Sequence, residues 1–179
     1  MSWMSQIGNV LQQYAGGASA SAPSPDVHDH FDQVAKAAPQ STIASGLAAA
    51  FQSGQTAGFG PMLGTLFSNS SSEQKAGLLN QLLSSVNPAM LTSILGGAGL
   101  SGLLGGGGGA PQITPEQAQK ISPEVVTQIA THAQSTNPSI VDSVSSFYAQ
   151  HSGLIKTLGG AALTVALAKV AQHQQSASA

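Results

Sequence analysis

The sequence is poor in charged side chains: only 12 of its 179 residues are Asp, Glu or Lys, and arginine is absent. A soluble domain usually devotes about a quarter of its residues to charge. Two stretches, 37–72 and 76–115, carry no formal charge at all. The polar residues are mostly neutral, with 25 Ser and 18 Gln. Such a surface repels its own copies weakly, so we expect the protein to form a homo-oligomer.

The missing residue types exclude several classes of function. Without arginine the chain cannot make the bidentate contacts to phosphate and guanine that are frequent in nucleic-acid binding. Its net charge of −2 gives no attraction for a polyanion. We therefore expect no nucleic-acid partner. Because cysteine is also absent, neither disulfides nor thiol chemistry contribute to the protein.

Motifs for catalysis or cofactor binding are missing as well. The sequence contains no Gly-x-Ser-x-Gly turn and no Walker A loop. The glycine run 105–109 is not followed by the Lys-Ser or Lys-Thr that a phosphate-binding loop needs. We therefore predict a protein that is not an enzyme and that binds no cofactor.

What the sequence does contain is a series of helical signals. Its apolar residues are mainly Ala and Leu, which suit closely packed helices better than a β-sandwich. Ser70 and Glu73 have the spacing of a capping box. Four prolines each follow a helix-capping residue and predict helix starts: Pro88, Pro115, Pro123 and Pro138. We predict an all-α fold, with short helices and helical hairpins joined by Gly-rich linkers.

The clusters of Gly and Pro predict the domain boundaries. The Gly-rich tract Gly96–Gly109 predicts a flexible linker. The alternative is that its bare backbone packs closely against other helices within an assembly. The predicted parts are an N-terminal amphipathic helix over 1–15, a flexible linker over 16–25, a helical domain over 26–95, a Gly-rich linker over 96–112, a second helical domain over 113–173 and a disordered tail over 174–179.

Two segments are candidate contact surfaces for self-association. The first is the apolar face of the N-terminal helix, because Trp and Tyr are frequent interface anchors. The alternative is that this helix packs on its own domain. The second is the apolar segment 154–171, whose row of small residues indicates either an interior helix or a homotypic interface. The candidate contact residues are Trp3, Ile7, Leu11, Tyr14, Leu158, Leu163, Leu167 and Val170.

The sequence gives little support for a membrane protein. The uncharged core of the apolar segment, Thr157–Ala168, has 12 residues, whereas a spanning helix needs about 20. Membrane contact is thus an alternative that we do not favour. The N-terminus lacks the basic region of a secretory signal. We expect a cytoplasmic protein, with secretion without a cleaved signal peptide as the alternative.

One polar cluster, residues 26–32, contains the candidate metal ligands. On a strand or loop, His28 and His30 would point the same way and could share a metal with Asp26 or Asp32. On the helix that we predict here, the two histidines diverge. The helix dipole already favours acidic residues in a first turn. We therefore predict no metal site.

Three segments resemble those of uncharacterised bacterial helical proteins rich in Ala, Gly and Gln: HFDQVA at 30–35, QKAGLLN at 74–80 and ITPEQ at 113–117. More loosely, the chain resembles the YidB-like family, which also joins short helices with Leu-Gly-Gly runs. A further resemblance, in composition, is to the harpins of plant-associated bacteria. We predict a non-enzymatic, self-associating structural or scaffolding protein. The alternative is an exported harpin-like protein that acts on membranes or host cells.

Overall fold

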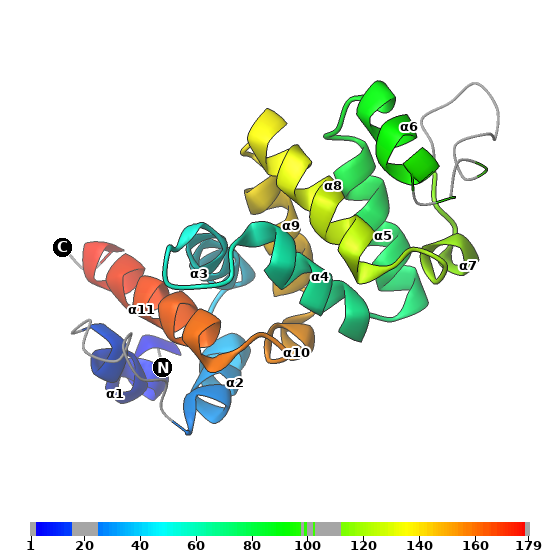
Figure 1. Cartoon of the computed structure of the whole chain (residues 1–179). Helices are drawn as coiled ribbons and strands as arrows, with labels where there is room; N and C mark the ends of the chain where they lie inside the picture. The colour runs from blue at the N-terminus through cyan, green and yellow to red at the C-terminus, as the bar shows by residue number, and fades with distance from the viewer. Residues whose placement is uncertain (1–2, 16–24, 98, 100–101, 103–111, 178–179) are drawn as a thin grey trace. The chain divides into compact units, whose positions relative to one another are not determined.

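The computed structural model describes residues 3–15, 25–97, 99, 102 and 112–177 (Figure 1). Within these residues the chain forms eleven helices and no strand, which confirms the predicted all-α class. The helices are α1 (Trp3–Ala15), α2 (Val27–Ala37), α3 (Gln40–Gln52), α4 (Phe59–Asn69), α5 (Ser72–Leu83), α6 (Pro88–Gly97), α7 (Pro115–Ala118), α8 (Pro123–Thr136), α9 (Ile140–Ala149), α10 (Ser152–Ile155) and α11 (Gly160–Ala177).

The chain divides into two compact units. Unit 1 comprises residues 1–58 and 145–179, and unit 2 comprises residues 59–144. Unit 1 therefore holds α1, α2, α3, α10 and α11, and unit 2 holds α4 to α8. The boundary at 144 falls within α9, so each unit receives half of that helix.

These units do not coincide with the predicted domains 26–95 and 113–173. Helix α3, from the first predicted domain, packs most extensively on α11 from the second, and α4 packs on α8 in the same way. A glycine tract is a local signal and carries no information about which distant helices pair. Most of the predicted linkers 16–25 and 96–112 lies outside the described residues. The predicted disordered tail 174–179 is wrong for residues 174–177, because helix α11 continues to Ala177.

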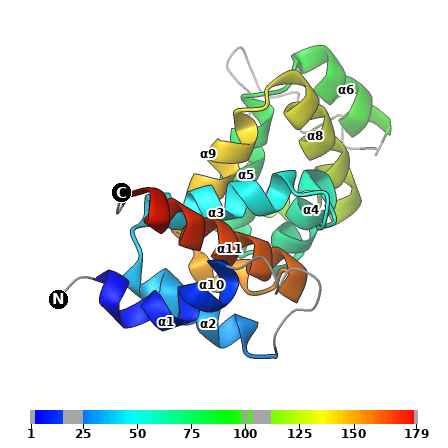
Figure 2. The ribbon, with the colours of Figure 1, turned by 90° about the vertical axis from the view of Figure 1, so that its left-hand side faces the viewer.

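Unit 1 is built around α11, which lies between α3 on one side and α1 on the other (Figure 2). Helices α3 and α11 approach to backbone contact at Gly46. A Cβ atom added there would lie 2.7 Å from the Ala166 carbonyl oxygen and 2.9 Å from Val170 Cγ2. Only glycine fits at this crossing without a shift of the helices.

Unit 2 has a similar close crossing between α4 and α8. A Cβ atom added at Gly64 would lie 2.6 Å from the Thr127 hydroxyl oxygen, and one added at Gly60 would lie 2.9 Å from the Thr127 carbonyl oxygen. The apolar side of α4 is buried at Leu63 and Leu66, each with an exposed fraction of 0 %. Helices α5 and α6 also pack on α8, and α7 packs on α5.

Helices α6, α7 and α8 begin at Pro88, Pro115 and Pro123, as the sequence predicts. The predicted start at Pro138 is wrong, because residues 138–139 form a turn and α9 begins at Ile140. The predicted capping box of α5, however, lies one residue further along the chain. The Ser71 hydroxyl accepts a hydrogen bond from the Gln74 amide, and the Gln74 side chain accepts one from the Ser71 amide at 2.9 Å. Ser70 instead donates to the Leu66 carbonyl at 2.7 Å, because its buried hydroxyl belongs to the end of α4.

Candidate functional site

The predicted contact face of α1 is buried inside unit 1. The exposed fractions of Ile7, Leu11 and Tyr14 are 2 %, 4 % and 1 %, because α1 packs on α11 and α2. The first helix thus packs on its own unit, the alternative given above, and these three residues offer no surface to a second copy. The side chain of Trp3 lies outside the described residues.

The second predicted contact surface is buried as well. Leu158, Leu163, Leu167 and Val170 all have exposed fractions of 3 % or less. These apolar side chains are buried inside unit 1. Helix α11 is therefore an interior helix, and its apolar side is not free to bind a second copy.

Among the helices that the structure describes, none is long and apolar enough to cross a membrane.

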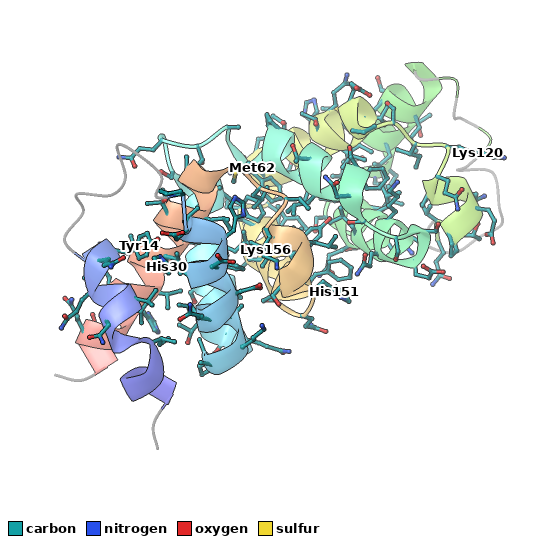
Figure 3. The ribbon with its side chains drawn as sticks, turned by 90° about the horizontal axis from the view of Figure 1, so that it is seen from below. Tyr14, His30, Met62, Lys120, His151 and Lys156 are labelled. Carbon is teal, nitrogen blue, oxygen red and sulfur yellow. The ribbon has the colours of Figure 1, made fainter. Side chains whose placement is uncertain are left out.

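The four candidate metal ligands do not converge on one point. His30 Nδ1 lies 2.8 Å from the Tyr14 hydroxyl (Figure 3). The Asp32 carboxylate pairs with the Lys156 ammonium at 2.8 Å. His28 is exposed, and Asp26 precedes the first residue of α2. In the described part of the chain, no three His, Asp or Glu side chains gather as a metal site would require.

The Tyr14–His30 contact connects α1 to α2. The two rings meet edge to face, with centroids 5.8 Å apart and planes at 80°. This geometry is favourable for aromatic pairs, and the hydrogen bond satisfies the buried phenol. In the sequence, Tyr14 was a candidate interface anchor and His30 a candidate metal ligand. Their contact spans 16 positions of the chain, which a local pattern does not encode.

Two exposed carboxylates stand in the first turns of helices in unit 2. Hydrogen bonds from its own backbone amide and from the Thr114 hydroxyl hold the pKa of Glu116 below the ordinary value for glutamate. The backbone amide of Glu124 and the Ser122 hydroxyl lower the pKa of Glu124 in the same way. Both carboxylates lie where the helix dipole favours a negative charge.

These lowered pKa values predict a loss of stability in acid. A carboxylate whose folded-state pKa is lowered adds stability above the ordinary pKa of glutamate, and this contribution disappears as the pH falls through the lowered value. We expect the urea midpoint of unit 2 to decrease below about pH 4.5. The double variant Glu116→Gln and Glu124→Gln should decrease less steeply. An identical pH slope for variant and wild type would contradict this assignment.

Two open grooves of unit 2 are lined by residues that the structure describes. The α4/α8 groove has a volume of about 280 Å³ and is lined by Pro61, Gly64, Thr65, Ser68, Pro123, Glu124 and Thr127. The α6/α8 groove has a volume of about 390 Å³ and is lined by Ser93, Ile94, Gly97, Val125 and Gln128. These five lining residues of the second groove are all uncharged. In the α4/α8 groove, the hydroxyls of Thr65, Ser68 and Thr127 donate to carbonyls of their own helices.

Many exposed hydroxyl groups donate within their own helix. Thr65 donates to the Pro61 carbonyl at 3.2 Å, and Thr92 donates to the Pro88 carbonyl at 2.9 Å. Thr131 makes the same contact four residues back, at 2.8 Å. Because these donors already have protein partners, covering them by another molecule breaks fewer hydrogen bonds to water. At these positions the surface is neutral, and covering it costs fewer hydrogen bonds to water.

Asn80 is a structural residue that sequence reasoning missed. Its side-chain oxygen accepts a hydrogen bond from the Ile113 amide at 2.7 Å, and its side-chain nitrogen donates to the Ile113 carbonyl at 3.2 Å. Ile113 is buried, with an exposed fraction of 3 %. The Asn80 clamp therefore fixes the chain that enters α7 against α5. An Asn inside a helix carries no sequence signal for such a partner 33 positions away.

Models of protein families, curated proteins and solved structures were each compared with the chain, and none of the three comparisons gives a match. The resemblances to YidB-like proteins and to harpins therefore stay predictions from composition and short segments. These comparisons assign no function to any residue of this chain.

Proposed function

We propose that the protein is a non-enzymatic structural protein that associates with copies of itself. The observation that supports this most is the scarcity of charge, with 12 charged residues in 179. Like charges on colliding molecules normally oppose association, and here that opposition is weak. The exposed hydroxyls that donate within their own helices lower the cost of dehydrating the surface further.

The buried stripes of α1 and α11 limit how this association works. Their apolar residues stabilise unit 1, so a second copy must bind elsewhere on the surface. Contacts on a neutral and mostly polar surface are weaker than those of an obligate oligomer, which buries an apolar area like that of a divided core. We therefore propose a reversible association that depends on protein concentration.

The salt dependence of this association tests its physical basis. We expect the weight-average mass, measured by light scattering, to rise with protein concentration. Because charge pairs contribute little, raising the ionic strength tenfold, from about 0.05 M to about 0.5 M, should not reduce that mass. Dissociation at high salt would show that ionic contacts hold the copies together and would contradict the proposal.

A further inference from the structure

Helix α6 presents a neutral face with an exposed apolar side chain. Helices α1, α3, α4 and α6 contain no charged residue. The large apolar residues of α3 and α4 are buried. On α1, Ile7 and Leu11 are buried and Val10 is half-buried. Among the residues that the structure describes, Met90 on α6 is the large apolar side chain most exposed to solvent, at 37 %. The helix thus combines absence of charge with apolar exposure.

Two glycines of α6 have no packing role within the chain. A Cβ atom added at Gly96 or Gly97 would meet nothing within 4 Å, in contrast to the glycines at the α3/α11 and α4/α8 crossings. Glycine destabilises a helix by about 1 kcal/mol relative to alanine. Their φ angles also do not require glycine, since Gly58 and Gly99 are the described residues with positive φ. The bare backbone at Gly96 and Gly97 leaves room for a neighbour to approach closely.

The α6/α8 groove lies beside this face. Ile94 is half-buried and stands four positions after Met90, so the two side chains share one side of the helix. Ile94 and Gly97 line the groove from α6, and Val125 lines it from α8. The groove volume of about 390 Å³ is ample for a single methionine side chain.

We propose that α6 is the surface through which two copies of the chain associate, and that Met90 of each copy enters the α6/α8 groove of the other. This inference rests on the self-association proposed above. A two-fold contact brings the same patch of each copy together, so the patch must be complementary to itself. A patch with one sign of charge would repel its own copy. The neutral face of α6, with a projecting Met90 and a groove beside it, meets this requirement.

The small size of α6 makes this contact weak. The helix has 10 residues and is therefore about 15 Å long. A helix face of that length covers an area far below the roughly 800 Å² per partner of a stable complex. We therefore expect the α6 contact to form a transient dimer that is populated only at high protein concentration.

A lysine in place of Met90 provides the test. We expect Met90→Lys to weaken dimerisation about tenfold or more, because its charge would enter a groove without a counter-charge. Its thermal midpoint should fall only slightly, since Met90 is 37 % exposed and the helix dipole opposes a lysine in the first turn of α6 only mildly. The matched control is Gln52→Lys, which places the same charge on an exposed position of α3. The control should dimerise like the wild type in sedimentation velocity.

Mixing two variants separates a contact from an indirect effect. Gln128 lines the groove from α8, so Gln128→Glu supplies a carboxylate for the incoming lysine of the other variant. Mixed Met90→Lys and Gln128→Glu chains should form a heterodimer that is tighter than the Met90→Lys homodimer. If Met90→Lys dimerises like the wild type, or if mixing restores nothing, the α6 surface is wrong while self-association stands. A wild-type chain that stays monomeric at every concentration overturns both.

Discussion

Gly46→Val is expected to destabilise unit 1 by about 2–4 kcal/mol. Gly46 lies where α3 crosses α11, and even a single added carbon would come within 2.7 Å of the Ala166 carbonyl oxygen. That oxygen belongs to the backbone of α11, so it cannot rotate away as a side chain could. The helices would have to separate, and buried neighbours such as Leu47 and Leu163 would lose contact.

The matched control is Gly8→Ala on α1. A Cβ atom at Gly8 would meet nothing within 4 Å, so alanine adds helix propensity without a clash. We expect this substitution to stabilise unit 1 by about 0.5–1 kcal/mol. Urea denaturation followed by far-UV circular dichroism measures both variants. Equal midpoints for Gly46→Val and wild type would show that α3 and α11 do not cross as described.

Asn80→Ala is expected to destabilise unit 2 by about 2–4 kcal/mol. The substitution removes both hydrogen bonds to Ile113, and it leaves a half-buried amide and a half-buried carbonyl of the main chain without their partner. A fully buried group costs about 1–3 kcal/mol when it is left unsatisfied, and partial access to water keeps the sum for these two groups at about 2–4 kcal/mol. The loss should therefore exceed that of an ordinary surface substitution severalfold.

Hydrogen exchange makes the Asn80 prediction specific. The amide of Ile113 should exchange faster in Asn80→Ala, because its acceptor is the Asn80 side chain. Gln81→Ala, at the next position of α5, removes a side chain of similar size and serves as the control. If the two variants lower the urea midpoint by the same small amount, the clamp contributes nothing particular to stability.

The sequence predicted the helices well because the signals for helices are local. Pro88, Pro115 and Pro123 begin helices as predicted, since the residues that start a helix lie within one turn of it. The capping box of α5 was misplaced by one residue. Ser70 and Ser71 both match the local pattern, and what decides between them is the burial of Ser70 at the end of α4.

The pairing of the helices could not be predicted in the same way. The apolar face of α1 was visible in the sequence, yet the sequence did not say whether α11 or a second copy covers it. The same holds for the glycines. Gly46 lies at a helix crossing and Gly97 faces open space, although both are glycines in helices made of small and apolar residues. Only the tertiary arrangement distinguishes them.

Sedimentation equilibrium of the wild-type chain tests the central claim, reversible association through a neutral surface, most directly. The measurement would run from dilute protein to the highest soluble concentration. The account predicts an average mass that rises from that of the 17.8 kDa monomer toward that of a dimer and returns to the monomer value on dilution. A mass that stays at 17.8 kDa throughout would contradict it.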